Sequence, residues 1–390
     1  MYEYRKSEDV EALMEIAKFS FVVEKSKHEF LRKYIRTALV SGVEMFGVYD
    51  SKKLVAAHLL YPYQMRFRNS MVSMGGISKI CSRPDYRGKG TIRFMLEKSI
   101  ETMRDKGMVV SMLHPFNVSF YRKYGWELFF RKKLVLLSPG SLIAKENPSI
   151  TAEYLKFPDE VCKEFYNEHA RREYNLALRD DPHWKRHLEL SNNEAANGVV
   201  KFERDGKIVG MMALYLSSGE AMFESIVTVK DFIYNDNETK ETMLNYLKRL
   251  SLQVTKLRMV LPEDFLLWPY LSDQPSEEKI GNAGMIRIVS VEKLDGLSVD
   301  FELEPLIVSV NDKFSEENTG NFEIKAEGGF LRISRSTKSP DIECDVSCLS
   351  SIISGFTSFK EMIEAGRVQV FEDYRGQDLP KVVTFNLEPF

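Results

Sequence analysis

A short basic turn with two glycines, Arg87–Gly90, is the part of the chain whose residue types most clearly suggest chemistry. It follows a run typical of a buried strand, residues 76–82, and precedes an amphipathic helix predicted from about Thr91 to Lys106. The N-terminus of a helix leaves backbone N–H groups without partners and carries partial positive charge. Glycines that expose these amides beside an arginine and a lysine therefore predict an anion site suited to a pyrophosphate. The spacing of a magnesium-nucleotide P-loop is missing, and taken alone the turn also fits an ordinary solvated connection.

The elements around this turn predict a mixed α/β arrangement in the first third of the chain. A β-hairpin is expected over residues 46–60, and a further buried strand follows the helix at 109–113. The step from helix to strand implies a right-handed crossover. The candidate anion site thus lies where a strand meets the start of a helix.

The middle third repeats this plan with different residues. Residues 200–215 resemble the hairpin, 225–229 resemble the strand before the basic turn, and 240–253 are typical of an amphipathic helix. The turn itself is not repeated, because residues 234–238 contain two acids and no glycine. We infer a duplicated fold whose second site no longer receives a phosphate.

Length and linkers predict the domain organisation. A chain of 390 residues is two or three times as long as a usual single core. A polar segment at 273–284 is interpreted as a linker, and the short alternating strands and two helices after it (345–356 and 359–365) as a third unit. The predicted domains are residues 1–140, 141–282 and 283–390.

Composition excludes several classes of protein. The net charge of −3 provides no overall basic field for nucleic acid or anionic lipid. Four scattered cysteines do not form a disulfide framework, and we expect no metal site because neither the pair Cys344 and Cys348 nor the pair His183 and His187 has the remaining zinc ligands. The charged N-terminus lacks the apolar segment of a signal peptide, and no run reaches the roughly 18 apolar residues of a membrane span, so a cytoplasmic protein is expected.

The basic turn resembles the acetyl-CoA pyrophosphate loop of the GNAT superfamily of N-acetyltransferases, whose pattern is R/Q-x-x-G-x-G/A. Its sixth position is Ile92, which departs from that pattern. This departure and the aromatic stretch 112–127 make the chain similar to the Eis (enhanced intracellular survival) acetyltransferases, and the similarity extends to residues 339–350 and 365–368. The resemblance implies an α/β (α+β) protein with tandem GNAT folds, the second degenerate, followed by a sterol-carrier-protein-like α+β domain. It also implies acetyl-CoA as cosubstrate.

The resemblance further implies roles for individual residues. Transfer of an acetyl group to an amine needs a neutral amine, a donor for the carbonyl oxygen and a proton for the departing thiolate. Tyr121 matches the general acid of Eis-like enzymes, and the terminal carboxylate of Phe390, delivered by the third domain, matches the base. Backbone atoms of Ile80 and Ser82 are expected to pair with the pantetheine arm. The cofactor-binding residues implied in this way are Ile80, Ser82, Arg87, Gly88, Lys89, Gly90 and Thr91.

The two catalytic candidates also have simpler structural interpretations. Tyr121 also fits a packed aromatic residue, with Tyr124 as its nearest competitor, and Phe390 fits a frayed tail, although Phe385 and Leu387 are apolar as a docked tail requires.

The leading functional hypothesis is N-acetylation of polyamine or aminoglycoside-like small molecules. Glu24 and Glu388 are candidates for an acceptor pocket, and each also fits a solvated surface charge. One alternative is acetylation of peptide lysines. Another is lipid binding by the third domain, which requires an enclosed apolar cavity of roughly 300 Å³ or more in residues after about 284. The resemblance also implies a homo-oligomer, a hexamer, with a small-molecule amine as partner and neither nucleic acid nor membrane.

Overall fold

The computed structural model describes residues 1–20, 28–188, 197–219 and 224–388. It divides into two compact units. The first unit combines Met1–Phe130 with Ala283–Thr384, and the second combines Arg131–Asn282 with the tail residues 385–388. Glu24 and Phe390 lie outside the described residues.

The first unit begins with a mixed sheet in which β1 to β5 lie in sequence order and the last residues of β12 follow. Only β4 and β5 are parallel, while β1, β2, β3 and β4 pair antiparallel, as does β12 with β5. The strands are β1 (Tyr2–Ser7), β2 (Glu44–Asp50), β3 (Lys53–Phe67), β4 (Ser70–Ser82), β5 (Val110–Leu113) and β12 (Glu277–Ile288). The helices are α1 (Val10–Ala17), α2 (His28–Val40), α3 (Thr91–Asp105) and α4 (Val118–Arg122).

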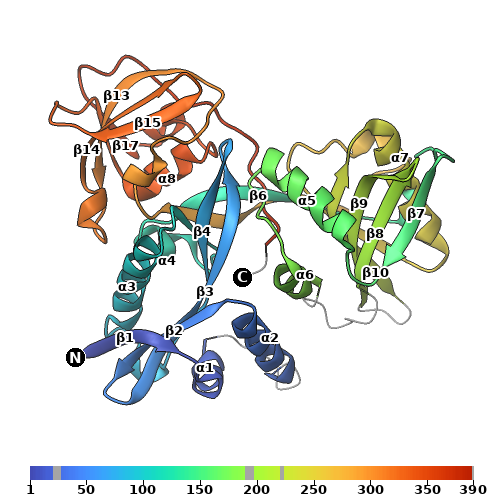
Figure 1. Ribbon diagram of the computed structural model, residues 1–390, viewed down its shortest axis with the longest axis horizontal. Coiled ribbons are helices and arrows are strands. Elements are labelled where there is room, and N and C mark those ends of the chain that lie inside the picture. Colours follow the sequence, from blue (N-terminus) through green and yellow to red (C-terminus); the bar gives the residue numbers. More distant parts are fainter. Residues whose placement is uncertain (21–27, 189–196, 220–223, 389–390) are drawn as a thin grey trace. The chain divides into compact units, whose positions relative to one another are not determined.

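Helix α3 packs on one face of strands β3 and β4, and α1 lies on the other side of these strands (Figure 1). The apolar stripe Leu96, Ile100 and Met103 repeats at helical spacing and contacts Leu60 and Ile77 in one buried cluster. Burial of this stripe fixes the rotation of α3 and therefore the direction in which its N-terminus points.

An irregularity in β4 opens the sheet next to that N-terminus. Lys79 has a φ of +54°, and the pairing register between β3 and β4 shifts at this point. The parallel pairing of β4 with β5 covers only Met74–Gly76. Such a bulge redirects a strand and ends its pairing, so the part of β4 after the bulge diverges from β5.

The second unit repeats this architecture, as the sequence predicts. Its strand order is β6-β11-β10-β9-β8-β7, with β10 and β11 parallel. Here too a register shift, between Lys230 and Ile233, accompanies a positive φ of +51° at Asp231. The strands are β6 (Glu127–Leu137), β7 (Ile150–Leu155), β8 (Gly198–Arg204), β9 (Lys207–Ser218), β10 (Ser225–Tyr234) and β11 (Lys256–Leu261). The helices are α5 (Glu160–Arg172), α6 (Asp181–Leu188) and α7 (Asn237–Arg249).

The third predicted domain is a five-stranded sheet with two helices, seen at the top of Figure 1. The strand order is β15-β14-β13-β16-β17, and β13 and β16 are parallel. All eight residues of α8 are buried, so this helix forms the centre of the domain. The elements are β13 (Leu303–Asn311), β14 (Gly320–Glu327), β15 (Phe330–Arg335), β16 (Ile342–Asp345), α8 (Val346–Ile353), α9 (Phe359–Glu364) and β17 (Val368–Val370).

One sequence prediction is wrong. The segment 273–284, interpreted as a linker, largely belongs to strand β12, which begins at Glu277. The first six residues of this strand are exposed, so their polarity reflects contact with solvent rather than a loop. The last four residues, from Met285 on, are buried because they pair with β5 inside the sheet, and three of these four are apolar.

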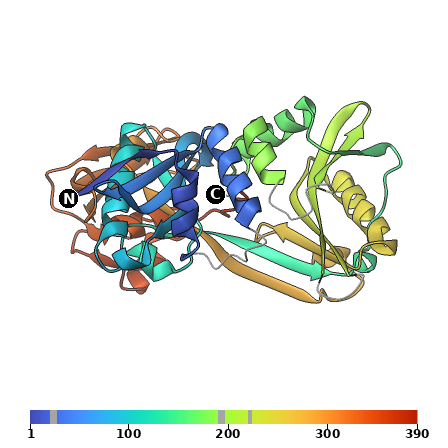
Figure 2. The same cartoon turned by 90° about the horizontal axis from the view of Figure 1, so that it is seen from below.

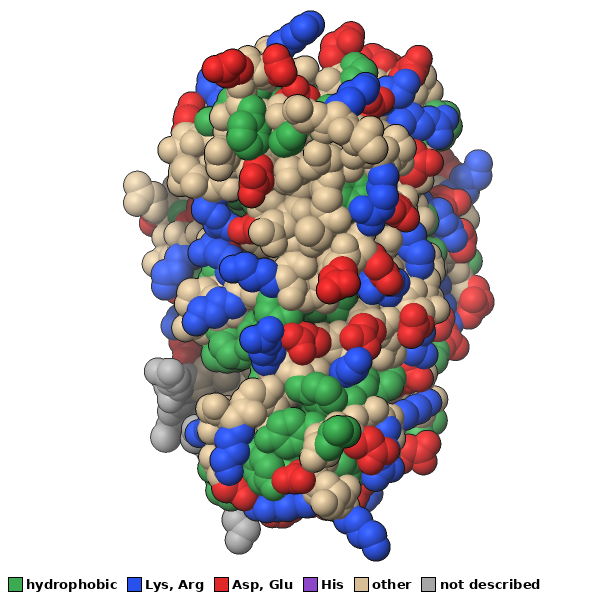
Figure 3. Space-filling model, turned by 90° about the vertical axis from the view of Figure 1, so that its left-hand side faces the viewer, with side chains coloured by type: hydrophobic (Ala, Val, Ile, Leu, Met, Phe, Trp, Pro, Cys, Tyr) green, Lys and Arg blue, Asp and Glu red, His purple; other side chains and the backbone are tan. Residues whose placement is uncertain are grey.

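The face of the structure shown in Figure 3 carries lysine and arginine side chains interspersed with carboxylates, together with a group of hydrophobic side chains in its lower part. This mixture agrees with the small net charge. On this face the charges do not form a uniformly basic surface.

Candidate active site

The basic turn reaches α3 through two glycines in the left-handed region. Gly88 has a φ of +76°, and Gly90, the N-cap of α3, has a φ of +77°. A side chain is strained in this conformation. Gly90 also supplies no side-chain cap, so the first amides of α3 are not bound by a capping side chain. The turn therefore presents backbone donors at the positive end of the helix dipole.

A pocket of about 640 Å³ lies directly beside this turn. Its lining includes six of the seven residues predicted to bind the cofactor: Ile80, Ser82, Arg87, Gly88, Gly90 and Thr91. Lys89, the seventh, is exposed and lies over the ring of Tyr86 at 5.0 Å. The remaining lining residues are Ser20, Cys81, Ile92, Arg93, Phe116, Phe120 and Tyr124.

The bulge in β4 explains why Ile80 and Ser82 reach this pocket. Both residues come after Lys79, where β4 has diverged from β5, and they line the opening together with Cys81. A diverging strand exposes backbone groups that a paired strand uses in its ladder. An extended ligand arm can therefore pair with this part of β4 as an added strand does.

Two arginines contribute positive charge to the pocket lining. The Arg87 guanidinium donates to the backbone oxygen of Phe19 at 2.6 Å, which holds the side chain near the turn. Arg93, in the first turn of α3, forms an exposed ion pair with Glu97 at 3.0 Å. An anion at the helix N-terminus thus meets amides beside the Arg87 guanidinium, whereas the Arg93 guanidinium lies over the ring of Phe314, 5.5 Å from its centre.

An aromatic wall forms the other end of the pocket. Asn117 caps α4 by accepting a hydrogen bond from the amide of Phe120 at 2.9 Å, which fixes the short helix. Phe116, Phe120 and Tyr124 line the pocket at steps of four residues. Sequence reasoning did not assign this wall to the site, although the four-residue spacing of the aromatic residues is a signal that could have found it.

Tyr121 lies directly behind this wall. Its side chain is buried, and its ring packs edge-on against Phe116 at 5.4 Å and Phe120 at 5.1 Å. Burial raises the pKa of the Tyr121 phenol above its ordinary value, so the group holds its proton at neutral pH. Tyr124, which lines the pocket itself, also has a raised pKa because of burial.

Glu388 is not a solvated surface charge. Its side chain is 1% exposed, and it accepts hydrogen bonds from Arg179 Nε at 2.7 Å and from Tyr166 Oη at 3.4 Å inside the second unit. Phe385 and Leu387 are buried in the same unit, beside Trp184 and Tyr166. The described part of the tail is therefore docked, and its assignment to an acceptor pocket stays a prediction.

The second copy closes the site that the first copy leaves open. Helix α7 is capped by Asp236, whose carboxylate accepts a hydrogen bond from the amide of Thr239 at 2.8 Å. Arg204 pairs with Asp236 at 2.5 Å and with Glu238 at 3.1 Å. An anion here would meet carboxylates instead of free amides, which gives the physical reason why this copy is degenerate.

Within the described ranges, no group of three or more His, Cys, Asp or Glu side chains is arranged to hold a metal ion. No helix in the described part of the chain has the length and apolar character required to traverse a bilayer. The four cysteines are buried free thiols.

Comparisons with known proteins agree with this geometry. Residues 2–129 and 176–288 each match an acetyltransferase (GNAT) domain family, and residues 295–382 match the sterol carrier protein domain family. No curated protein gives a significant match. The chain is thus a GNAT-type N-acetyltransferase with two acetyltransferase domains and a sterol carrier protein domain.

Solved structures share the whole arrangement. A GCN5-related N-acetyltransferase from Anabaena variabilis superimposes with a TM-score of 0.86 at 17% identity, with 100% of both chains covered. A protein from Enterococcus faecalis described as a probable N-acyltransferase gives 0.84 at 19% identity, also over 100% of both chains. Eis1 from Mycobacterium abscessus gives 0.74 at 15% identity over 100% of both chains. The fold of this three-domain chain is therefore the one found in Eis1.

Proposed function

We propose that the chain transfers the acetyl group of acetyl-CoA to an amine of a small molecule that carries several amino groups. The observation that carries this proposal is the pocket of about 640 Å³ in which the uncapped amides of α3 lie beside Arg87 and the open part of β4. A pyrophosphate fits the amides, and a pantetheine arm fits the strand at Ile80 and Ser82.

The reaction is a direct attack of the neutral amine on the thioester carbonyl. The new C–N bond forms, the C–S bond breaks, and one proton leaves the nitrogen while another reaches the thiolate. Tyr121 supplies the proton to sulfur. Its raised pKa keeps the phenol protonated between turnovers, and its ring packs against Phe116 and Phe120, which line the pocket.

The terminal carboxylate of Phe390 is the proposed base. A terminal carboxylate of pKa about 3.3–3.7 is a weak base, so it accepts the proton from an ammonium held beside it, directly or through water. Buried Phe385, Leu387 and Glu388 anchor the tail close to that residue in the sequence.

The acceptor class is the part of the proposal that rests most on resemblance. A polyamine or aminoglycoside-like acceptor carries several positive charges and is attracted by carboxylates. Acetylation of peptide lysines uses the same chemistry. Lipid binding by the third domain is less well supported, because the cavity of about 440 Å³ that its residues line contains the charged side chains of Glu343, Asp345 and Arg367.

Thiol release from acetyl-CoA, measured with a panel of polyamines, aminoglycosides and lysine peptides, tests the proposal. Tyr121→Phe is compared with Tyr124→Phe, which removes a phenol from the pocket wall itself, and with a chain extended beyond Phe390. We expect Tyr121→Phe and the extension to lower kcat strongly, and Tyr124→Phe to raise KM for acetyl-CoA instead. Full turnover by both the Tyr121 variant and the extended chain would overturn the mechanism, and absence of turnover with every amine would overturn the acceptor class.

We also propose a hexameric assembly, carried by the resemblance to Eis-like enzymes. Light scattering of the purified protein measures the mass directly, and a mass of one 45.1 kDa chain would contradict it.

A further inference from the structure

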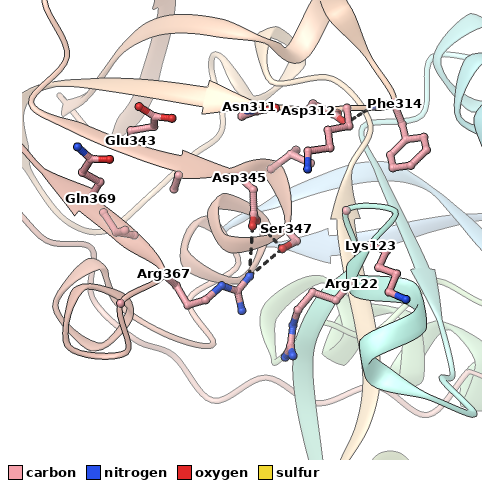
Figure 4. A pocket seen from close by; sticks show the side chains of 16 residues that line it. Arg122, Lys123, Asn311, Asp312, Phe314, Glu343, Asp345, Ser347, Arg367 and Gln369 are labelled. Atoms are coloured by element: carbon pink, nitrogen blue, oxygen red, sulfur yellow. Dashed lines mark hydrogen bonds and ion pairs between the residues drawn. The ribbon is translucent and has the colours of Figure 1, made fainter.

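A second pocket lies within the first unit, away from the basic turn of α3. Its volume is about 440 Å³, which falls in the range of small-molecule sites. It forms where the segment after α4 meets the third domain, and we call it the junction pocket (Figure 4). Its walls come from four segments of chain: residues 122–125, 311–314, 343–347 and 366–369.

One buried carboxylate organises the basic side of the junction pocket. Glu127, whose side chain is 3% exposed, accepts two hydrogen bonds from Arg122 at 2.7 Å each and one from Arg367 at 3.1 Å. A single negative charge therefore holds two guanidinium groups from distant parts of the sequence. Arg367 also donates to Ser347 Oγ at 3.2 Å and to Asp345 at 3.4 Å.

Two lysines also line the pocket. Lys123 follows Arg122, and Lys313 lies on the loop after β13, and both line the pocket. Figure 4 shows Arg122, Lys123, Arg367 and Ser347 around one end of the hollow, whereas Glu343 and Gln369 lie at the other end. Donors from separate elements thus converge on one region.

The charges of this end are not balanced by the protein. Four cationic side chains, Arg122, Lys123, Lys313 and Arg367, are accompanied by the carboxylates of Glu127 and Asp345, which leaves an excess of two positive charges. Glu343, at the opposite end of the pocket, lowers the excess of the whole lining to one. Asp312, which also lines the pocket, is neutralised by a buried ion pair with Arg287 at 2.5 Å. A phosphate monoester carries close to two negative charges at neutral pH and three acceptor oxygens, which match this excess and these donors.

We propose that the junction pocket binds the phosphate group of a phosphate monoester. A carboxylate carries one charge and two oxygens, so it satisfies fewer of these donors. The opposite end, with Glu343 and Gln369, then contacts hydroxyl or amino groups of the remainder of the ligand. With a separate metabolite as ligand the site does not depend on the proposed acetyl transfer, whereas with the 3′-phosphate of coenzyme A as ligand it rests on that proposed function.

The phosphate has two conceivable sources, because the two pockets are neighbours. Tyr124 lines the acetyl-CoA pocket, and its ring lies 5.1 Å from that of Phe314, which lines the junction pocket. The guanidinium of Arg93, which also lines the acetyl-CoA pocket, lies over the same Phe314 ring, 5.5 Å from its centre. The monoester is therefore either the 3′-phosphate of coenzyme A or a separate metabolite.

Calorimetry with the full-length protein tests the site, with inorganic phosphate and adenosine 3′,5′-bisphosphate as probes. Lys123→Gln and Lys313→Gln change exposed side chains and leave the Glu127 cluster intact, so the fold is retained. Each is expected to weaken phosphate binding about tenfold, as the loss of one charge-assisted contact does. Lys52→Gln, on an exposed turn of the first unit, is the matched control and is expected to bind as the wild type does.

Two further measurements identify the source and challenge the proposal. If the 3′-phosphate of coenzyme A occupies the site, the lysine variants raise KM for acetyl-CoA but not for acetyl-dephospho-CoA. If a separate metabolite occupies it, phosphate binding weakens while both KM values stay unchanged. No heat with either probe in the wild type, or equal binding by wild type and both lysine variants, would overturn the site.

Discussion

The two acetyltransferase copies have the same kind of sheet, bulge and crossover helix, yet they differ at the start of that helix. In the first copy the helix begins at Gly90, which has no side chain to cap it, and in the second it begins after Asp236, which caps Thr239. A capped helix is more stable. The two arrangements exclude each other, because the amides that a cap satisfies are the ones that an anion at the helix N-terminus would bind.

The residues at the two bulges also differ: the bulge of the first copy lies beside an open pocket, whereas the bulge residue of the second copy is bound by other side chains. Lys79, in the first copy, lies beside an open pocket of about 640 Å³. Asp231, in the second copy, forms hydrogen bonds of 2.8 Å with Arg179 and with His187. The corresponding cleft of about 360 Å³ is lined by Phe385 and Leu387. The degenerate copy has thus become the receptor for the described part of the chain's own tail.

The largest expected effect comes from breaking this network. Arg179→Met leaves Asp231 and Glu388 buried, at 1% side-chain exposure each, without their cation. Removing one partner of a buried ion pair costs about 3–5 kcal/mol, which we expect as a loss in the free energy of unfolding of the second unit. Urea unfolding followed by tryptophan fluorescence measures it, since Trp184 lies in that cluster.

Arg179→Lys, which keeps the charge, is the matched control and should lose less. A variant that also carries Asp231→Asn and Glu388→Gln should recover part of the stability. Equal stability of Arg179→Met and the wild type would show that the network does not hold the tail.

Buried histidines provide a pH test in the first copy. His58 is fully buried, and this burial lowers its pKa to about 4. As the pH falls below 6.5, His58 takes up a proton in the unfolded chain but not yet in the folded chain. The stability present above pH 6.5 is therefore lost as the pH falls toward 4. The expected loss is about 3 kcal/mol. Denaturation midpoints between pH 7 and 4 measure it, and His58→Gln should flatten this slope; an unchanged slope would contradict the assignment.

Tyr121→Phe should lower kcat about 100-fold if the phenol is the general acid, since such catalysis contributes about 10²–10⁴-fold. The same change removes little volume from the buried cluster, so stability should change by less than about 1 kcal/mol. Initial rates at saturating acetyl-CoA and thermal unfolding measure the two effects. A rate within twofold of the wild type would assign the proton to another group.

Importing the second copy's cap into the first should close the anion site. Gly90→Asp places a carboxylate among the amides and is expected to raise KM for acetyl-CoA about tenfold. Gly90→Asn tolerates the left-handed conformation equally well without the charge, so it should raise KM less. If both variants bind acetyl-CoA as tightly as the wild type, the diphosphate lies elsewhere.

The smallest effect is expected from removing the cap of the second copy. Asp236→Ala removes the cap of α7 and should cost about 1 kcal/mol of stability without changing KM for acetyl-CoA. Thermal unfolding and steady-state rates measure both quantities. A change in KM would show that the degenerate copy still contributes to cofactor binding.

Local patterns predicted the parts of the site that are close in sequence. The turn Arg87–Gly90 and helix α3 follow from glycine, charge and periodicity, and the structure brings six of the seven predicted cofactor residues into one pocket. The interpretation of 273–284 as a linker failed because an exposed strand and a loop have the same polar composition. Glu388 was equally ambiguous, because a buried carboxylate differs from a solvated one only through its partner.

The amino-acid sequence by itself determined the duplicated architecture, the open turn at Gly90 and the acidic counterpart without glycine at 234–238, since these depend on neighbours within a few residues. Only the tertiary structure decided which distant charges meet. Arg179 pairs with Glu388, which lies 209 positions away in the sequence, and Arg367 pairs with Glu127, which lies 240 positions away. Such pairs leave no periodic signal, because folding selects them through burial and geometry, which the order of residues does not display.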